Sequence, residues 1–462
     1  MGGGILQLLA LGPQNLYLTG NPQITFFKKV YKRYTNFSVE QMEQILIGDK
    51  SFGKRLRCEI ENKGDLLKDI YILVKLNNGP GINYNDFYKN IFKLGFSIID
   101  YVEIEIGGQV IDRHYGTWLD IWSQLTFTSD KYRLLMSLIK DKRNDLKFNN
   151  YTNSINYTGV NTENKYIYIP LQFWFNRDIG LALPLIAIQY HKVVLNIKFK
   201  ELENIKVVDE TIENTYSDLY EFVPKNNLDN NSIFNSDTDV IDRGWKIENF
   251  TGNIEDVICY CDYIFLDVDE RKIFANKSHE YLIEQVQTLE KLDMPKLTES
   301  DLSNNIEFSL EFNHPIKEII WCVQNKLLEG IPYYNNLDMS TIIKDVLLLS
   351  NNIEYIKRRE VDYFNLIQIY QFHSAGGLLA DNKNRYYNGG FYTYSFSIDP
   401  ENYQPSGTLN FSKLNSFIIN FNYQKSSSDI TNIDEEYKFT CYAINYNILK
   451  IENGMAGLAY SN

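Results

Sequence analysis

The chain has 462 residues, enough for two to four domains, and carries a formal net charge of −13 at pH 7. An acidic surface repels polyphosphate, so the charge argues against a nucleic-acid-binding protein. Hydrophobic residues make up 44% of the chain and aromatic residues 14%, which is ample for packed cores and favours strands over helices.

The spacing of the cysteines and the length of the apolar segments limit the class of protein further. The chain has an odd number of cysteines at wide spacings, with no Cys-x-x-Cys pair: Cys58, Cys259, Cys261, Cys322 and Cys441. Cys259 and Cys261 are two apart in a strand-like run, so their side chains share a face, which is poor geometry for a direct disulfide. We therefore predict reduced thiols and a cytosol-like compartment. No segment approaches the ~20 apolar residues that a membrane-spanning helix needs.

The N-terminal residues look unlike the rest of the chain. Residues 1–24 are Gly-rich, then apolar, and reach a turn at Gly20-Asn21-Pro22, where Pro22 fixes its own φ and restricts Asn21. This pattern predicts an arm outside the core, with a disordered tail as the alternative. Strands are predicted over Ile24–Phe27 and Phe37–Ile47. Between them lies a basic stretch, Lys28-Lys29 with Lys32-Arg33, which we interpret as a solvated or subunit-facing strand end.

Alternating apolar residues predict further strands over Ile70–Leu76 and Ile98–Ile106. A helical segment follows, because five residues are spaced for one helix face: Tyr115, Trp118, Leu119, Trp122 and Leu125. A second helix is predicted from Leu134, Leu135, Leu138 and Ile139. We interpret these aromatic side chains as a cap on a sandwich; the sharper alternative is a Trp-lined ligand pocket.

The remaining elements alternate strands with polar segments. Residues 141–165 and 200–240 are polar and Asn-rich, which predicts long exposed loops. Strands are predicted over Tyr166–Ile169, Leu171–Phe175, Val193–Phe199 and Val257–Leu266, and a short helix over Asp269–Ser278. An irregular stretch is predicted at 325–345. The second half shows the same alternation of strands and polar segments, with strands predicted near 281–288, 306–312, 316–324, 361–371, 391–398, 408–422 and 437–450. Many short strands, twice over, predict two β-sandwiches.

Two short sequences recur in order along the chain. Val39-Glu40-Gln41 returns as Ile283-Glu284-Gln285, and Lys68-Asp69-Ile70 returns as Lys317-Glu318-Ile319 at nearly the same offset. Each match is weak by itself, but the shared order and spacing predict that one module is used twice. A duplicated β-module is more often a building device than a catalytic one.

A set of motifs runs in order from residue 20 to the C-terminus. It includes Gly20-Asn21-Pro22-Gln23-Ile24-Thr25-Phe26-Phe27, Leu183-Pro184-Leu185-Ile186, Asp262-Tyr263-Ile264-Phe265, His279-Glu280-Tyr281, Phe312-Asn313-His314-Pro315, Gln404-Pro405-Ser406-Gly407 and Gly454-Met455-Ala456-Gly457. Together these motifs resemble the major capsid proteins of nucleocytoplasmic large DNA viruses, the phycodnavirus, iridovirus and mimivirus-like group.

The resemblance implies an all-β double jelly roll, two eight-stranded sandwiches in tandem with short helices and long loops. We expect an arm (1–24), a first roll (25–268), a linker (269–280) and a second roll with a C-terminal tail (281–462). It also implies a structural virion protein, assembled in the host cytoplasm, whose homotrimers form pseudo-hexagonal capsomers of an icosahedral shell. The implied partners are neighbouring capsomers, minor capsid and penton proteins, and an adjacent internal viral membrane, with no direct nucleic acid. Loops 141–165 and 200–250 would face outward.

No residue set predicts catalysis, so we expect no enzyme, and no catalytic, cofactor-binding or metal-binding residues. Asp267, Asp269 and Glu270 lack the acceptors and glycine of a calcium loop, and helix capping explains them better than a metal. The five histidines, His114, His191, His279, His314 and His373, lack zinc-site spacing. Glu103 and Glu105 share a strand face, which we interpret as a solvated face rather than a glycosidase pair. The alternative function is a β-sandwich that binds or processes carbohydrate.

Overall fold

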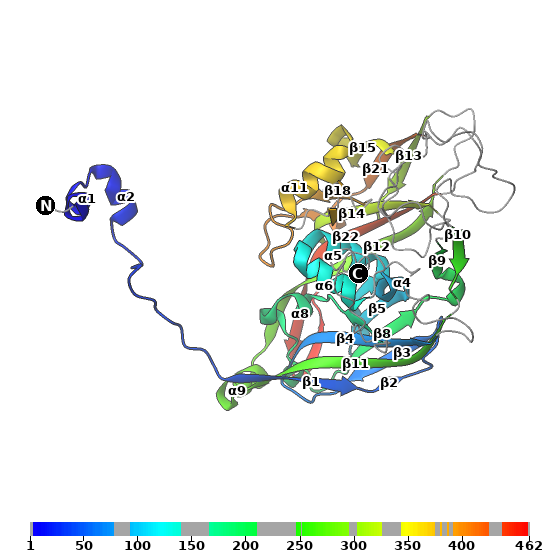
Figure 1. Ribbon diagram of the computed structural model, residues 1–462, viewed down its shortest axis with the longest axis horizontal. Coiled ribbons are helices and arrows are strands. Elements are labelled where there is room, and N and C mark those ends of the chain that lie inside the picture. The colour runs from blue at the N-terminus through cyan, green and yellow to red at the C-terminus, as the bar shows by residue number, and fades with distance from the viewer. Residues whose placement is uncertain are drawn as a thin grey trace, which may run out of the picture. The chain divides into compact units, whose positions relative to one another are not determined.

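The structure is a computed structural model that describes residues 3–77, 93–139, 166–209, 246–250, 252–294, 303–325, 343–374, 379–380, 386–387, 391–424 and 437–460. The chain divides into an arm, Met1–Phe37, and a body, Ser38–Asn462. Strands dominate the body (Figure 1). The predicted loop 141–165, residues 210–240 of the second predicted loop and most of the irregular stretch 325–345 lie outside the described residues.

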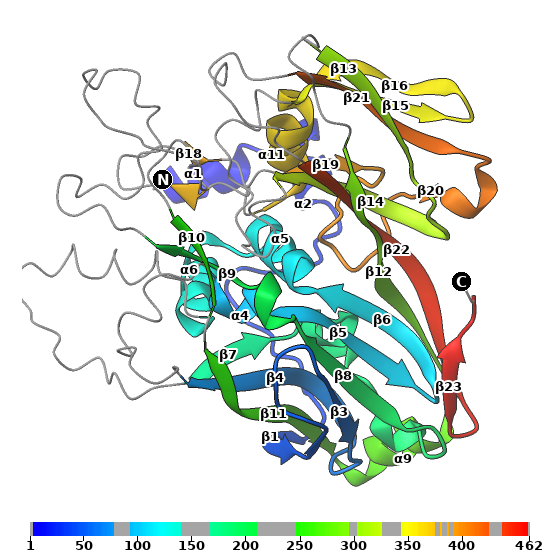
Figure 2. The ribbon, with the colours of Figure 1, turned by 90° about the vertical axis from the view of Figure 1, so that its right-hand side faces the viewer.

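The first sandwich of the body consists of two antiparallel sheets (Figure 2). One sheet has the order β1 (Phe37–Gln44), β11 (Asn253–Leu266), β4 (Leu66–Asn77) and β7 (Tyr166–Pro170). The other has the order β2 (Leu46–Ile47), β3 (Arg55–Ile60), β8 (Val193–Phe199), β5 (Ile99–Ile106) and β6 (Gln109–Tyr115). Their facing side chains, such as Leu56, Ile72, Leu195 and Cys259, are fully buried and form the first core.

The second sandwich is built the same way. Its larger sheet has the order β12 (His279–Asp293), β22 (Tyr437–Glu452), β14 (Pro315–Asn325) and β19 (Phe391–Ser395), with β20 (Leu409–Asn410) on β14 and β23 (Met455–Leu458) on β22. The facing sheet has the order β13 (Ser303–Ser309), β21 (Phe417–Gln424), β15 (Ile343–Ser350) and β16 (Ile353–Glu360). Phe308 stacks on Phe439 with ring centroids 4.5 Å apart in this second core.

The two sandwiches share one topology. The order β1-β11-β4-β7 corresponds strand for strand to β12-β22-β14-β19, and β3-β8-β5-β6 corresponds to β13-β21-β15-β16. In both, the first strand along the chain pairs with the last, as a jelly roll requires. The predicted double jelly roll is therefore confirmed, and the repeated triplets lie on corresponding strands: β1 and β12 for one pair, β4 and β14 for the other.

The helices are short and lie mainly in the connections. In the body they are α4 (Leu94–Ser97), α5 (Gly116–Thr126), α6 (Ser129–Leu138), α8 (Trp174–Arg177), α9 (Val268–Asn276), a π-helical turn η6 (Tyr363–Ile367) that runs into α11 (Gln368–Phe372), and the 3-10 turns η2 (Ile179–Leu181), η3 (Leu185–Ala187), η4 (Leu202–Asn204) and η7 (Phe411–Lys413). Two small ribbons pair β9 (Lys206–Asp209) with β10 (Lys246–Asn249) and β17 (Leu379–Ala380) with β18 (Tyr386–Tyr387). The predictions of α5, α6 and α9 are confirmed.

Two predicted strands of the body are wrong. Residues 171–175 lead into helix α8 instead of a strand, and residues 361–371 form η6 and α11. Both runs are short and apolar, and such runs fit a buried helix as well as a strand by periodicity alone. The structure also contains the hairpin β15–β16 just before η6, which the sequence reading missed because β16 is polar along most of its length.

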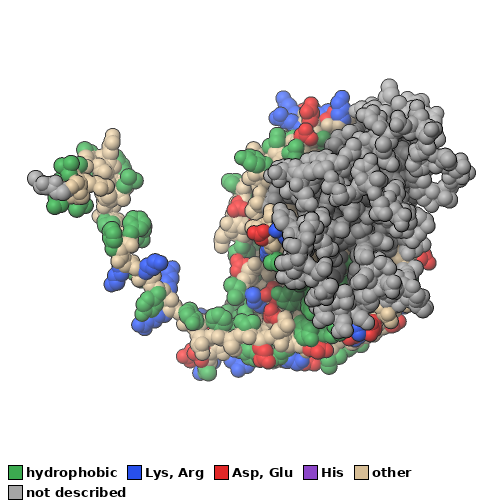
Figure 3. Space-filling view, viewed as in Figure 1, with side chains coloured by type: hydrophobic (Ala, Val, Ile, Leu, Met, Phe, Trp, Pro, Cys, Tyr) green, Lys and Arg blue, Asp and Glu red, His purple; other side chains and the backbone are tan. Residues whose placement is uncertain are grey.

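The arm contains α1 (Gly3–Leu9), η1 (Pro13–Asn15) and α2 (Leu16–Thr19). Residues 20–36 contain no strand, so the predicted strand Ile24–Phe27 is wrong. An isolated strand has no partner strand for its backbone groups, and these exposed residues pair with no strand in the described part of the chain. Hydrophobic and basic side chains follow one another along the arm (Figure 3). Among the described residues, no helix of the chain is long and apolar enough to cross a bilayer.

Candidate functional site: the joint between the two sandwiches

Helix α5 follows the last strand of a sheet in the first sandwich and packs against the second sandwich (Figure 2). Trp118 is fully buried; its ring stacks on Trp122 at 5.4 Å between centroids and lies 5.3 Å from Tyr442 of β22. Leu119, the next residue of the helix, is buried in the first core. The helix therefore joins the two cores by apolar contact, on the outer face of the β12-β22-β14-β19 sheet, where it contacts Ile320, Cys322, Phe391 and Ile444.

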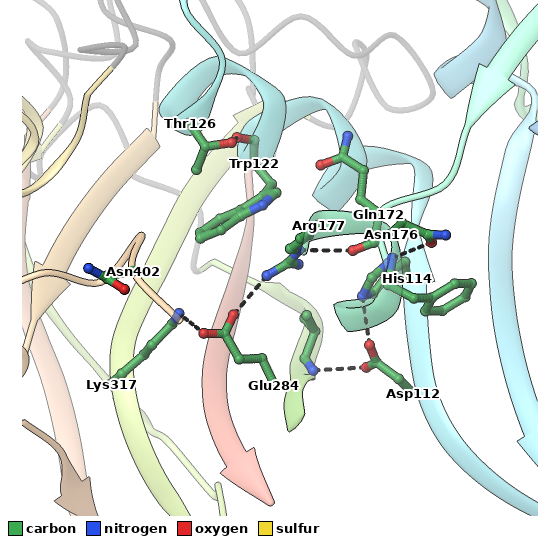
Figure 4. A network of polar contacts seen from close by, with 12 residues as sticks. Asp112, His114, Trp122, Thr126, Gln172, Asn176, Arg177, Glu284, Lys317 and Asn402 are labelled. Atoms are coloured by element: carbon green, nitrogen blue, oxygen red, sulfur yellow. Dashed lines mark hydrogen bonds and ion pairs between the residues drawn. The ribbon is translucent and has the colours of Figure 1, made fainter. Parts of the chain in front are cut away.

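A charged network crosses the joint beside this helix (Figure 4). Arg177, at the end of α8 in the first half, donates from Nη1 to Glu284 Oε2 of β12 at 2.8 Å. The other oxygen of Glu284 accepts from Lys317 of β14. Both cations also lie over the ring of Trp122, the guanidinium at 4.6 Å and the ammonium at 5.8 Å from its centroid. One carboxylate thus links a helix of the first half to two strands of the second.

Burial and the carboxylate act in opposite directions on these cations. Lys317 has a fully buried side chain, and desolvation lowers its pKa below the usual value although Glu284 acts to raise it. Burial lowers the pKa of Arg177 in the same way, again against the charge of Glu284. A buried ion pair contributes little net stability, but removing one partner leaves a charge without compensation and costs much more. The network therefore fixes how the two halves meet.

Hydrogen bonds between side chains and backbone join β12 to β6. The side chain of Gln285 donates to the carbonyl of Ile111, and the backbone N–H of Val286 donates to Asp112 Oδ1 at 2.9 Å. The second oxygen of Asp112 lies 2.8 Å from Nε2 of His114, which is fully buried and stacks on Phe173. These contacts require both halves at once, because β6 belongs to the first sandwich and β12 to the second.

The long strands of the second sandwich continue onto the first. Ile283 of β12 with Leu449 and Ile451 of β22 are buried in the first core rather than in their own. At the end of β22, the N–H of Tyr190 donates to the carbonyl of Gly454 at 2.9 Å. Gly454 has φ +75°, and a Cβ there would lie 2.6 Å from the Tyr190 ring, so glycine is required on both counts. The joint is thus a continuous interface along these strands.

His373 forms a second polar cluster on the sheet that α5 covers. Its Nε2 lies 2.7 Å from Glu318 of β14, and its Nδ1 lies 3.1 Å from Glu401. Burial alone would lower the pKa of His373, but the charge and hydrogen bonds of Glu318 and then Glu401 outweigh it and raise the pKa to about 9. His373 is therefore a cation at neutral pH, and it compensates the fully buried Glu318.

The acids at the start of α9 have a structural role. Asp267 is the N-cap and accepts from the N–H of Val268 at 2.7 Å, and Asp269 and Glu270 occupy the first turn, where acids favour the helix dipole. In the described part of the chain, no three His, Cys, Asp or Glu side chains gather to hold a metal ion. The absence of catalytic, cofactor and metal sites stays a prediction.

Other residues that the sequence singled out are placed differently from expectation. Glu103 is almost fully buried and pairs with Arg55 at 2.7 Å and with Arg113, so the prediction of a solvated face is wrong for this residue. Apolar alternation along β5 could not predict this burial, because the partners of Glu103 come from other strands, Arg55 from β3 and Arg113 from β6. Trp118 and Trp122 are covered by protein side chains, which disfavours the ligand-pocket alternative. The four tryptophans among the described residues are all buried, which leaves the carbohydrate alternative without an exposed indole platform there.

The remaining histidines and the cysteines have structural surroundings. His279 Nε2 lies 2.8 Å from the carbonyl of Phe274, and His191 Nδ1 lies 2.9 Å from that of Ala456. The backbone N–H of His314 donates to Ser412 Oγ at 2.7 Å. All five cysteines are free and buried. Cys58, Cys259 and Cys261 are in the first core, where the hydrogen bond with Cys259 and then burial raise the pKa of Cys58 far above its usual value.

Sequence reasoning missed most residues of the joint. Arg177 and Glu284 are 107 positions apart, and no local pattern connects them. The available signal was the repeat itself: Glu284 and Lys317 both belong to the recurring triplets, and their strands β12 and β14 lie in one sheet on either side of β22. The aromatic face of α5 was found, but it joins two sandwiches instead of capping one.

Comparison with known proteins covers nearly the whole chain. Residues 25–267 match a family described as the major capsid protein N-terminus, and residues 270–457 match the large eukaryotic DNA virus major capsid protein. The chain is similar to the major capsid proteins of Pyramimonas orientalis virus (36% identity) and Paramecium bursaria Chlorella virus 1 (33% identity), each over 100% of both chains. Its fold is similar to a chain in the quasi-atomic PBCV-1 virus capsid, with 28% identity and a TM-score of 0.67 over 95% of this chain and 100% of that one.

Proposed function

The chain belongs to the major capsid proteins of large eukaryotic DNA viruses, and from this premise we propose that three copies associate head to tail into pseudo-hexagonal capsomers that tile an icosahedral shell. It is a structural protein of the virion capsid and not an enzyme. The observation that carries the proposal is a difference between two equivalent sheet faces.

In the second sandwich, the outer face of the β12-β22-β14-β19 sheet is covered by α5 of the first half. Among the described residues, no helix covers the corresponding face of the first sandwich as α5 covers this one; only its Leu66 and Ile264 end packs against Phe274 of α9. Tyr71 of β4 and Tyr260 of β11 are half-buried there, whereas their counterparts by position, Ile320 and Tyr442, are buried. Val39 is 49% exposed, whereas Ile283, its counterpart in the repeated triplet, is fully buried.

The helical connection of the second sandwich shows the matching difference. α5 lies between β6 and β7, and η6 with α11 lie between β16 and β19, the same place in the second roll. One face of η6–α11 is buried through Phe364 and Ile369, as Leu119 of α5 is. The other face exposes apolar side chains: Leu366 and Ile367 at 44% and Tyr370 at 86%.

These two exposed surfaces complement one another as α5 and its sheet do. The exposed face of η6–α11 in one copy would cover the first-sandwich sheet of the next copy. This contact between chains would resemble the contact between α5 and its sheet within one chain. Such a contact joins different surfaces of identical chains, and it forms a closed ring when the rotation permits. Six sandwiches from three chains would give the near-hexagonal outline, with interfaces on the order of 2,000 Å² or more.

The same proposal extends to the wider assembly, with membership of the family as its support. The capsomers would contact minor capsid and penton proteins, the shell would lie next to an internal viral membrane, and assembly would take place in the host cytoplasm. No direct nucleic-acid contact is expected, which agrees with the net charge of −13.

Light scattering coupled to size exclusion tests the association. We expect a particle of three times the chain mass of 54.1 kDa. Tyr370→Glu places a charge in the proposed contact and should yield monomers with unchanged circular dichroism, because Tyr370 is exposed in the chain itself.

Ile353→Glu is the control, since Ile353 is 71% exposed but lies at the turn of the β15–β16 hairpin, away from η6–α11. A wild-type chain that stays monomeric under assembly conditions would overturn the trimer. Trimers that tolerate Tyr370→Glu as well as Ile353→Glu would overturn the proposed contact.

A further inference from the structure

The arm has a charge opposite to that of the chain as a whole. Residues 1–39 contain no Asp or Glu, and they carry four basic residues, Lys28, Lys29, Lys32 and Arg33, in a chain of net charge −13. A cationic segment on an acidic protein is attracted to anionic surfaces that repel the rest of the molecule. The arm is therefore a separate electrostatic element.

The arm is also strongly apolar, and its apolar side chains are exposed. Tyr17 is 92% exposed, Phe26 87% and Phe27 98%, and the same holds in lesser degree for Ile5, Leu6, Leu8, Leu9, Leu16, Leu18, Val30, Tyr31 and Tyr34. Exposed apolar residues gathered this densely mark a surface that another phase or partner covers.

The order of these residues separates two functions along the arm. Residues 3–19 form the helical part and carry no charge. Residues 26–34, Phe26-Phe27-Lys28-Lys29-Val30-Tyr31-Lys32-Arg33-Tyr34, then interleave aromatic with basic side chains. Aromatic rings favour the headgroup level of a bilayer, and lysine and arginine near it are attracted to anionic lipids.

From this arrangement we propose that the arm binds the surface of an anionic lipid bilayer. Residues 3–19 would lie at the boundary of headgroups and acyl chains, and the basic residues would contact the anionic headgroups. The arm would lie on the membrane rather than across it, because α1 and α2 are short helices and Gly12 and Pro13 lie between them.

Other occupants fit less well. A nucleic acid would be bound by the four cations, but the uncharged residues 3–19 would contribute nothing to phosphate contact. A protein groove accepts one apolar stripe of a helix. Leu16, Tyr17 and Leu18 are consecutive in α2, so their side chains point in three directions round it, and a lipid phase can cover all three.

Vesicle flotation of the full chain tests the inference. The probes are vesicles of phosphatidylcholine alone and of phosphatidylcholine mixed with phosphatidylserine, at low and high salt. We expect binding to the mixed vesicles that weakens with salt. Substituting Lys28, Lys29, Lys32 and Arg33 by Gln should lower the partition coefficient by roughly 10²- to 10³-fold at low salt, at ~1 kcal/mol for each cation.

The matched control removes four lysines from the body: Lys272→Gln, Lys277→Gln, Lys344→Gln and Lys357→Gln. All four are exposed, so net charge changes equally and binding should not fall. Phe26→Ser with Phe27→Ser keeps every charge and should weaken binding by removing the apolar contribution. Equal loss in the arm and control variants, or no flotation of the wild type, would overturn the proposal.

Light scattering of the same samples keeps this test separate from that of the trimer. Arm variants should remain trimeric, and the monomeric Tyr370→Glu should still float. Arm variants that lose trimers while binding lipid normally would assign the arm to a second copy, and arm-dependent retention on single-stranded DNA without flotation would assign it to nucleic acid; either result would overturn the lipid proposal.

Discussion

The two recurring triplets lie on corresponding strands of the two sandwiches, but the surroundings of their side chains differ. Glu40 on β1 is exposed, whereas Glu284 on β12 holds Arg177 and Lys317 across the joint. Lys68 on β4 pairs with its neighbour Asp69 at 3.0 Å and is 35% exposed, whereas Lys317 on β14 is fully buried. Duplication repeats the strand frame, and whatever covers the outer sheet face decides what the repeated residues do.

The backbone at these lysines is also repeated. In the first sandwich Asp69 pairs with Asp262 and Leu67 with Tyr263, which leaves Lys68 as the extra residue of a β-bulge. In the second, Glu318 pairs with Ile444 and Ile316 with Asn445, which leaves Lys317 in the same position. A bulge changes the direction of a side chain and bends the strand. The second half uses this shared feature to bring a cation into the joint.

The largest expected effect comes from the apolar part of the joint. Trp118→Ala empties a buried site between the sandwiches and should lower the free energy of unfolding by about 3–5 kcal/mol. Tyr370→Ala, on the corresponding helical connection of the second half, should change it by less than about 0.5 kcal/mol because the residue is exposed in the chain. Urea unfolding at a protein concentration at which the chain is monomeric checks both; similar losses would contradict the difference between the two faces.

Glu284→Leu compared with Glu40→Leu tests the repeated acid directly. Removing Glu284 leaves two partly or fully buried cations without their carboxylate, which should cost about 3 kcal/mol. Glu40→Leu should cost less than about 0.5 kcal/mol. The cost at Glu284 is near the lower end for a broken buried pair, because Lys317 can lose its proton.

The pH dependence of that variant gives a second measurement. Burial lowers the pKa of Lys317 in the folded state, so the unfolded chain binds more protons and folding gains stability as pH rises. The deficit of Glu284→Leu relative to wild type should therefore shrink from neutral pH towards the usual lysine pKa. A deficit that stays constant would mean that the loss arises from packing rather than from charge.

The next effect concerns Asp69 and Glu318, the acids that directly follow Lys68 and Lys317. Asp69 pairs at the surface, whereas Glu318 is buried against His373, whose pKa is raised to about 9 from an unfolded value near 6.5. Because the folded pKa is the higher one, the stabilisation is complete below about pH 6.5 and is lost as pH rises through about 9, by up to roughly 3 kcal/mol. His373→Gln should remove this slope from urea unfolding free energies between pH 6 and 9, whereas Asp69→Asn should leave it intact.

The sequence predicted the frame of the molecule better than its joint. The repeated triplets and the spacing of Trp118 and Trp122 suffice for two sandwiches and helix α5, because strand and helix periods are local properties. The different fates of Lys68 and Lys317 could not be predicted from triplets that are nearly identical. What separates them is α5 and Arg177, which come from distant parts of the chain, and α8 itself lies in an apolar run whose length fits either a helix or a strand.

The smallest effect compares two tyrosines at matching positions. Tyr442 pairs with Ile320, and Tyr260 pairs with Tyr71. Ile320 and Tyr71 each lie three residues after the lysine of the bulge. The Tyr442 hydroxyl forms a hydrogen bond with Thr117 of α5, so Tyr442→Phe should cost about 1 kcal/mol, and Tyr260→Phe close to nothing. A double-mutant cycle with Thr117→Val isolates the bond, because the second substitution should add little once the first is made. If the two free-energy costs are additive, the hydroxyls of Tyr442 and Thr117 take part in separate interactions. The difference between the two halves would then be limited to packing and charge.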